Sequence, residues 1–78
     1  MFDQDVLKRV VELFSTMTEA EEINEESELI EDLELSSMDV MFLISSLEEE
    51  FHISVPEKAI RQMVTVGDVV QVIQDLRK

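Results

Sequence analysis

Turn-forming residues are scarce in this chain, and their scarcity limits the folds open to it. Glycine and proline occur once each in 78 residues, as Gly67 and Pro56. Sheet proteins need frequent tight turns, which glycine and proline often supply. The sequence therefore favours a few helices joined by polar loops, and the expected class is all-α.

The chain is long enough for one small core. Folding of a chain this short hides only about 60% of the surface of the unfolded chain, so two cores would each be too small. We therefore expect a single domain over residues 1–78. Hydrophobic residues make up 45% of the sequence, which argues against disorder despite the high charge.

Three segments gather apolar residues on one face when successive residues are set about 100° apart. The first covers residues 3–14, with the face Leu7, Val10, Val11 and Phe14, widened by Val6 and Leu13. The second covers residues 36–51, with the face Val40, Leu43, Ile44, Leu47 and Phe51. The third covers residues 65–76, with the face Val66, Val69, Val70, Ile73 and Leu76. Each pattern predicts an amphipathic helix.

Hydroxyl and acid pairs mark two of the helix starts. Ser36 precedes Asp39 by three residues, and Thr65 precedes Asp68 in the same way, which is the spacing of a capping box. Pro56 is suited to the first position of a short helix over residues 56–63. We therefore predict a small up-and-down four-helix bundle, with three longer helices and one short helix.

Residues 15–35 form the long first loop of this prediction. Nine acidic residues crowd it, and it lacks clear periodicity. Apolar residues nevertheless recur within it and can pin it to the core, so we expect an ordered loop with a helical turn near residues 29–33. The expected anchors are Ile23, Leu29, Ile30, Leu33 and Leu35.

The negative charge of the chain argues against some classes of binding partner. The formal net charge is −13, which repels nucleic acid backbones and anionic lipid, and basic protein surfaces are its natural complement. No segment approaches the roughly 18 apolar residues of a membrane span. Asp3 and Asp5 make the N-terminal segment unlike a signal peptide. Cysteine is absent, which suits a reducing compartment, so we expect a cytoplasmic monomer.

Catalytic and metal sites find no support in the sequence. The sole histidine, His52, would lie more than roughly 20 Å from Ser37 along one helix, too far for a dyad. We interpret His52 as an exposed residue at the end of a helix. Residues 25–34 have neither the glycine nor the alternating oxygen ligands of a calcium loop. The consecutive acids Glu48, Glu49 and Glu50 fan around their helix rather than converge. We therefore predict no enzyme and no metal.

Two serines and an apolar patch stand at the start of the second helix. Ser36 and Ser37 lie where backbone N–H groups point outward, so either could cap the helix, and a phosphate ester on either would be favoured. Met38 and Phe42 point away from the core face, with Met41 on the flank. Exposed methionine and phenylalanine are typical of an adaptable docking surface.

These residues resemble the acyl carrier proteins. The resemblance is carried by residues 31–39 (EDLELSSMD), by the segment LEEEF at 47–51, by Val55-Pro56 and by residues 65–68 (TVGD), and it spans nearly the whole chain. It implies that Ser37 carries 4′-phosphopantetheine, covalently transferred from coenzyme A by a holo-synthase (phosphopantetheinyl transferase), and that acyl groups are held on it as thioesters. Ser36 would cap the helix and is the less expected attachment site.

The family also implies partners and a place for the acyl chain. The partners would be acyl-transferring and ketosynthase-type enzymes of fatty acid, polyketide or related biosynthesis, with basic or apolar docking surfaces. The expected docking residues are Met38, Asp39, Met41, Phe42, Glu48 and Glu49. The positions matching the family's acyl-chain cavity are Ile44, Leu47, Val55, Ile60 and Met63.

The sequence departs from the family pattern at five positions. Ser36 stands where the family has aspartate and Glu34 where it has glycine, while Phe42 replaces a frequent acid. Lys58 and Arg61 place positive charge on a usually acidic helix. These departures favour a specialised carrier. The alternative is an unmodified acidic scaffold or adaptor that docks through Met38, Met41 and Phe42.

Overall fold

The computed structural model describes residues 3–18 and 22–77, and the predicted all-α class is confirmed in them. The loop acids Glu19 and Glu21 lie outside the described residues. Four helices follow one another, and the described ranges contain one isolated β-bridge but no strand. The helices are α1 (Gln4–Ser15), α2 (Ser37–Phe51), α3 (Glu57–Gln62) and α4 (Val66–Leu76).

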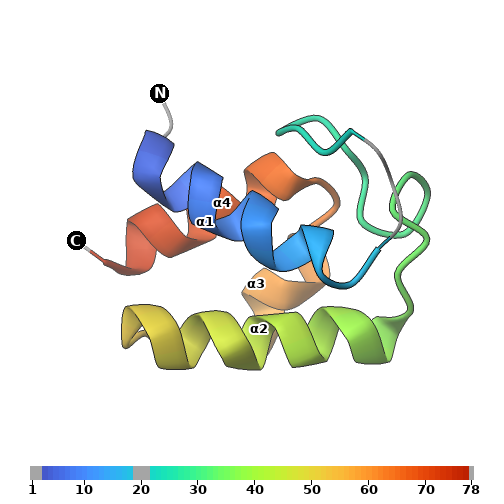
Figure 1. Cartoon of the computed structure of the whole chain (residues 1–78). Coiled ribbons are helices and arrows are strands. Elements are labelled where there is room, and N and C mark those ends of the chain that lie inside the picture. The colour runs from blue at the N-terminus through green and yellow to red at the C-terminus, as the bar shows by residue number, and fades with distance from the viewer. Residues whose placement is uncertain (1–2, 19–21, 78) are drawn as a thin grey trace.

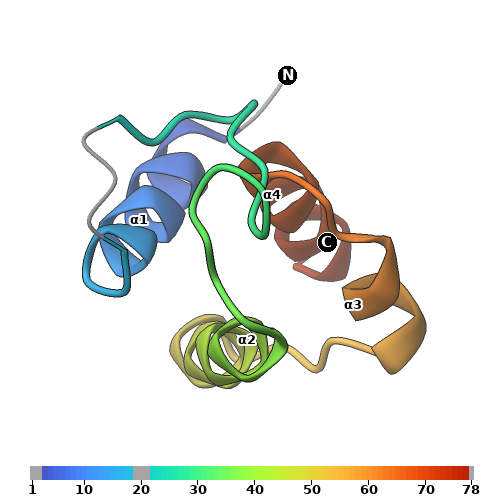
Figure 2. The ribbon, with the colours of Figure 1, turned by 90° about the vertical axis from the view of Figure 1, so that its right-hand side faces the viewer.

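The three longer helices enclose a common core, and the long loop closes one end of it. In Figure 1, α1 runs toward the loop, whereas α2 and α4 run away from it. The same three helices are seen nearly end-on in Figure 2, with α3 beside α4. The start of α2 therefore lies at the end of the bundle that the loop covers.

The core is built from the apolar faces of the helices together with anchors from the loop. Burial of this apolar surface is the main favourable term in folding. The largest side chains with almost no exposure are Phe14 of α1, Leu29 of the loop, Leu43 and Leu47 of α2, and Ile73 of α4. Leu33 and Leu35 of the loop are also buried, whereas Ile23 is half-buried.

Some of the predicted core positions are wrong. Val6 is buried, while Leu7 and Val11 are only half-buried, so the core face of α1 is rotated toward Val6. Ile30 is 54% exposed because it lies on the outer side of a turn whose inner side packs Leu29. Leu76 is 38% exposed because it is the last residue of α4 and extends past the core.

Phe51, the last residue of α2, is half-buried rather than fully buried. The guanidinium of Arg77 lies 5.2 Å from the centre of its ring. A cation over an aromatic face is a favourable contact, which accounts for the ring remaining near the surface.

The predicted helix boundaries agree closely with the structure. Both capping boxes, Ser36 with Asp39 and Thr65 with Asp68, are present. The short helix differs at both ends, because Pro56 is its N-cap and not its first helical residue, and Met63 is its C-cap. Pro56 has an extended backbone, and its carbonyl accepts from Ala59 at 3.0 Å.

Backbone hydrogen bonds to the start of α4 hold the long loop in place. The N–H of Leu29 donates to the carbonyl of Val64 at 2.9 Å, and Glu28 and Thr65 form the antiparallel bridge. Within the loop, the N–H of Asp32 donates to the carbonyl of Glu28 at 3.0 Å, which closes the predicted helical turn. The loop is therefore ordered where it approaches α2.

Within the described part of the chain, no helix has both the length and the apolar character needed to cross a membrane.

Candidate functional site

The two adjacent serines at the start of α2 have different surroundings. Ser36 is the N-cap: its Oγ accepts from the N–H of Asp39 at 3.2 Å, and its own N–H donates to Oδ2 of Asp39 at 3.0 Å. Ser37 is the first helical residue, and its side chain is exposed. The hydroxyl of Ser36 therefore takes part in the capping box, whereas the side chain of Ser37 lies at the surface.

A pocket of about 240 Å³ opens beside Ser37. The long loop, α2 and the region of α3 each contribute apolar walls, so the cavity lies between three segments. These walls are formed by Leu29, Ile30, Val40, Met41, Ile60 and Met63. Ser37 and Arg61 also line it, and Arg61 is the one charged side chain among its described lining residues. The arrangement places an exposed hydroxyl next to an apolar cavity with a cation on its wall.

Two of the five residues predicted for an acyl-chain cavity line this pocket, namely Ile60 and Met63. The other three do not. Ile44, Leu47 and Val55 are buried in the core, with exposed fractions of 2%, 0% and 8%. The structure therefore brings Ile60 and Met63 together with Ser37, and it leaves the other three positions in the packed interior.

The predicted apolar patch of α2 is exposed. Met38 is 83% exposed, Phe42 is 68% exposed and Met41 is 50% exposed. Met38 directly follows Ser37, so the patch begins beside the exposed hydroxyl. Met41 also lines the pocket, and it therefore connects the patch with the cavity.

The acidic residues predicted for docking have different roles in the structure. Glu49 is exposed. Asp39 belongs to the capping box, and Oε2 of Glu48 accepts from the N–H of Val55 at 2.8 Å. That bond fixes the connector between α2 and α3. This bond could not be predicted from the sequence, because no local spacing rule pairs a glutamate with a backbone N–H seven residues ahead.

Glu50 joins α2 to α1. The Nε of Arg9 donates to Oε2 of Glu50 at 2.6 Å, and its Nη1 donates to Glu12 at 3.1 Å. The hydrogen bond from Arg9 lowers the pKa of the Glu50 carboxyl below its ordinary value. The same two carboxylates raise the pKa of Arg9. Of the three consecutive glutamates, Glu48 and Glu50 thus accept hydrogen bonds from other segments of the chain, whereas Glu49 is an exposed residue between them.

The structure also supports the interpretation of His52 as a helix-end residue. It is the C-cap of α2, it is exposed, and its φ of 56° lies in the left-handed region. In the described residues, no three side chains of the histidine, cysteine, aspartate and glutamate types are placed to hold a metal ion together.

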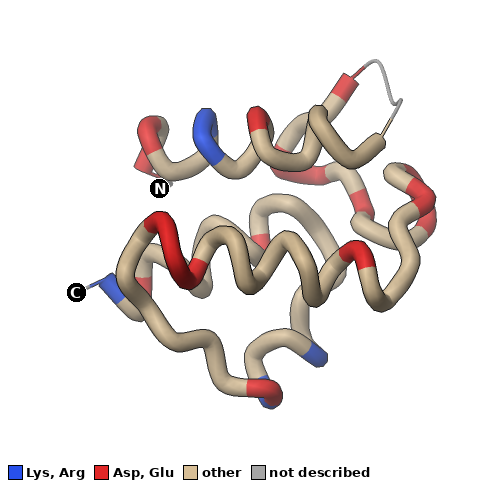
Figure 3. The backbone as a smooth tube through the Cα atoms, turned by 60° about the horizontal axis from the view of Figure 1, so that its bottom comes forward, with Lys and Arg blue, Asp and Glu red and all other residues tan. Residues whose placement is uncertain are grey.

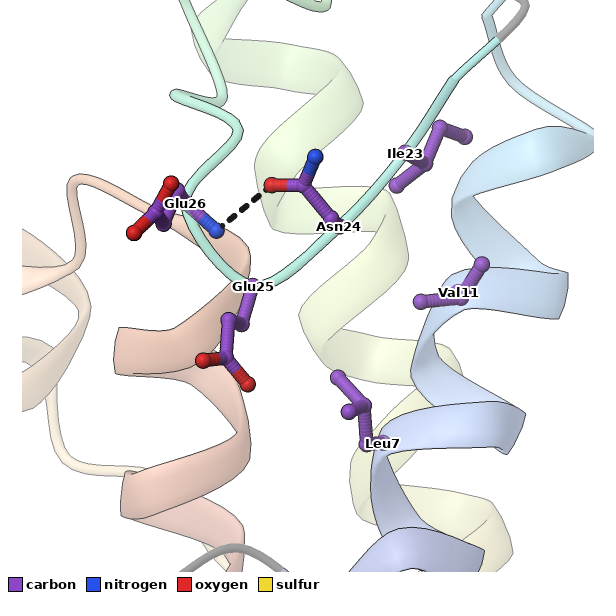
Figure 4. A pocket seen from close by; sticks show the side chains of 6 residues that line it. All are labelled: Leu7, Val11, Ile23, Asn24, Glu25 and Glu26. Atoms are coloured by element: carbon purple, nitrogen blue, oxygen red, sulfur yellow. Dashed lines mark hydrogen bonds between the residues drawn. The ribbon is translucent and has the colours of Figure 1, made fainter.

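A second cavity, of about 390 Å³, lies between α1 and the long loop. Figure 4 shows its apolar side, formed by Leu7, Val11 and Ile23, and its polar side, where Asn24 Oδ1 accepts from the N–H of Glu26 at 2.8 Å. It shares no lining residue with the pocket beside Ser37. Of these two cavities, the exposed hydroxyl of Ser37 therefore lines the first.

Comparison with known proteins adds an independent observation. Residues 6–73 match the family described as phosphopantetheine attachment site. The acyl carrier protein of Wolinella succinogenes is 42% identical over 74 residues, which cover 95% of this chain and 93% of that protein. That of Campylobacter lari is 40% identical over 78 residues, covering 100% and 97%. That of Helicobacter pylori is 42% identical over 57 residues, covering 73% of each.

Proposed function

The chain belongs to the acyl carrier proteins, and from this premise we propose that Ser37 is the residue that carries its 4′-phosphopantetheine arm. The protein is a carrier and not a catalyst. Its covalently attached arm supplies a thiol on which acyl groups are held as thioesters. The proposal concerns which of the chain's residues hold the arm and which meet the partner enzymes.

The exposure of Ser37 next to a capped Ser36 is the observation that supports this assignment. The Ser36 hydroxyl oxygen already accepts the hydrogen bond that completes the capping box, so attachment at Ser36 would use the oxygen that caps the helix. An ester on Ser37 would leave that bond intact. Its phosphate would lie at the N-terminus of a helix of 15 residues, where the dipole and outward N–H groups favour an anion. The residues present therefore fit the group.

The phosphopantetheine arm explains how a small domain can take part in biosynthesis without catalysing a reaction. An acyl group on a flexible arm stays at high effective concentration for whichever enzyme has docked the domain. The chain's own residues then need only to position one hydroxyl, to display a docking face and to keep the arm close to the surface. Chemistry on the acyl group belongs to the partner enzymes.

The protein works with a phosphopantetheinyl transferase and with biosynthetic enzymes. We propose that Met38, Met41 and Phe42 form the docking face, with Glu49 as its exposed acid. Partners of matching chemistry have apolar and basic surfaces. Asp39 and Glu48 act mainly within the chain, through the capping box and the connector.

We propose that the acyl chain is held at the five positions predicted from the sequence. The pocket between α2 and α3 gives an acyl chain a first contact on Ile60 and Met63. Ile44, Leu47 and Val55 lie deeper, so a longer chain would reach them only if the packing of the core opened. We also propose that residues 1–78 act as one domain, as a cytoplasmic monomer, and as a carrier specialised for its own partners.

Intact-mass measurement tests the attachment site. The chain is incubated with coenzyme A and a broad-specificity phosphopantetheinyl transferase. We expect the wild type to gain one phosphopantetheine and Ser37→Ala to gain none. Ser36→Ala should still be modified, and so should Ser45→Ala, which removes an exposed hydroxyl further along the same helix. Modification of Ser37→Ala, or its loss in Ser36→Ala alone, would contradict the assignment.

A further inference from the structure

The pocket beside Ser37 has a cation on its wall, although the chain as a whole is strongly acidic. The chain carries a net charge of −13, and Figure 3 shows acidic positions spread over the loop and the longer helices. Among the described residues that line this pocket, the charged one is nevertheless a cation, Arg61 of α3. An anion placed at the mouth of the pocket would therefore be attracted toward α3.

The loop that leads into α2 repels an anion. Glu31, Asp32 and Glu34 are exposed on the loop that leads into α2. A negatively charged group on the Ser37 oxygen would be repelled by these carboxylates and attracted by Arg61, which lines the same pocket as Ser37. Like charges repel and opposite charges attract, even where salt partly screens the interaction. Contact with Arg61 is therefore the electrostatically favoured contact for a tethered anion in this pocket.

Arg61 has donors available for such an anion. Its Nη2 donates to Oε1 of Glu57 at 2.6 Å, one turn earlier in α3. Both side chains are about three-quarters exposed, so this ion pair contributes little and can rearrange. A guanidinium has five N–H donors, and it binds phosphate oxygens in a bidentate manner. The pair with Glu57 therefore does not prevent a second contact.

We propose, on the premise that Ser37 carries the arm, that Arg61 is a positioning residue that binds the phosphodiester of the arm. The phosphodiester is bonded to the Ser37 oxygen, so it stays at the mouth of the pocket. Its contact with Arg61 directs the first segment of the arm over the apolar wall formed by Ile60 and Met63. The arm then has a resting place on the α3 side between docking events.

Amide NMR spectra of matched apo and holo forms test this role. Modification of the wild type should shift the amide signals of Ser37 and Met38 at the attachment point, and those of Ile60 and Met63 on the α3 side. In Arg61→Gln the first two shifts should remain and the last two should be lost. Added salt should reduce the α3-side shifts in the wild type, because the contact is between exposed charges.

Two control variants separate this contact from general effects of charge. Lys58→Gln removes the other cation of α3, which does not line the pocket, and it should keep the wild-type pattern of shifts. Glu57→Gln removes the competing carboxylate, and it should keep or enlarge the shifts at Ile60 and Met63. The apo spectrum of each variant reports whether α3 is still folded.

The outcomes separate the role of Arg61 from the attachment of the arm to Ser37, on which that role depends. Intact mass is recorded for every sample. A modified Arg61→Gln protein with full wild-type shifts at Ile60 and Met63 would overturn the role of Arg61 and leave the attachment at Ser37 intact. A wild type in which mass spectrometry finds the arm on another residue would overturn both proposals.

Discussion

Ser36 and Asp39 bind each other reciprocally, side chain to backbone in both directions, at the first turn of α2. The pair satisfies N–H groups that a helix start leaves without a partner inside the helix. It also orients the chain so that the next residue, Ser37, is exposed beside the pocket. One local motif thus starts the central helix and selects the hydroxyl that we propose for the arm.

The cap makes a prediction about stability. Ser36→Ala should lower the free energy of unfolding by about 1 kcal/mol, because the bond to the Asp39 N–H is lost. Ser36→Asp keeps an oxygen acceptor at the N-cap and should stay close to the wild type. Urea unfolding followed by circular dichroism measures both. Equal stability of the alanine and aspartate variants would show that the cap contributes nothing.

The backbone at Glu34 makes a second prediction. Its φ of 54° lies in the left-handed region, where a residue with a Cβ loses roughly 1–2 kcal/mol and glycine does not. Glycine also makes the unfolded chain more flexible, which offsets part of this gain. Glu34→Gly should therefore raise the free energy of unfolding by about 0.5–1 kcal/mol. Glu31→Gly is the control, since Glu31 has no positive φ, and it should not stabilise the chain.

The features that were predicted correctly depend on residues close together in the sequence. Both capping boxes and the buried positions of α2 from Val40 to Leu47 follow from spacings of three and four residues. The features that were missed join distant segments. The bond between Glu48 and the Val55 N–H, and the pair of Arg9 with Glu50, exist because the fold brings their atoms together. No periodic pattern in one segment contains that information.

The errors at Ile30 and Leu76 have a similar origin. Helical periodicity gives the direction of a side chain around its own axis, but it does not say where the neighbouring elements end. Leu76 has the correct direction, yet it lies at the last residue of α4. At the candidate site, the two serines could be recognised from the sequence, whereas the place of Arg61 in the same pocket required the packing of α3 against the loop and α2.

The apolar face of α2 makes a third prediction. Phe42 is 68% exposed, so Phe42→Glu should change the free energy of unfolding by less than about 0.5 kcal/mol. It should nevertheless weaken binding to a cognate enzyme, because a charge replaces an apolar anchor. Thermal unfolding and titration with a partner enzyme, for example the transferase that modifies the chain, measure the two effects.

Leu43 is the matched control on the buried side of the same helix. Its side chain is 1% exposed, and Leu43→Ala should cost about 2–5 kcal/mol through the lost burial and the cavity left behind. A loss of this size in Phe42→Glu would mean that Phe42 supports the fold and is not a docking residue.

The link between α1 and α2 makes a prediction about pH. The hydrogen bond from Arg9 lowers the pKa of Glu50, so the ionised carboxylate stabilises the folded state. This contribution is complete above the ordinary glutamate pKa of about 4.3, and it is lost as the pH falls through the lowered value. Glu50→Gln should be less stable than the wild type at pH 7, and this difference in the free energy of unfolding should disappear in acid. The difference should be small, because both side chains are substantially exposed.

Glu49→Gln is the control for the overall charge, because it removes one negative charge from an exposed neighbouring position. In a chain with a net charge of −13 this change reduces self-repulsion, so it should not lower stability at pH 7. Unfolding curves for the three proteins at pH 7 and in acid isolate the effect of the pair. If Glu50→Gln and Glu49→Gln had the same pH profile, the bond between α1 and α2 would have no energetic role. If the stability difference from the wild type disappears in acid for Glu50→Gln alone, the hydrogen bond between Arg9 and Glu50 is its source.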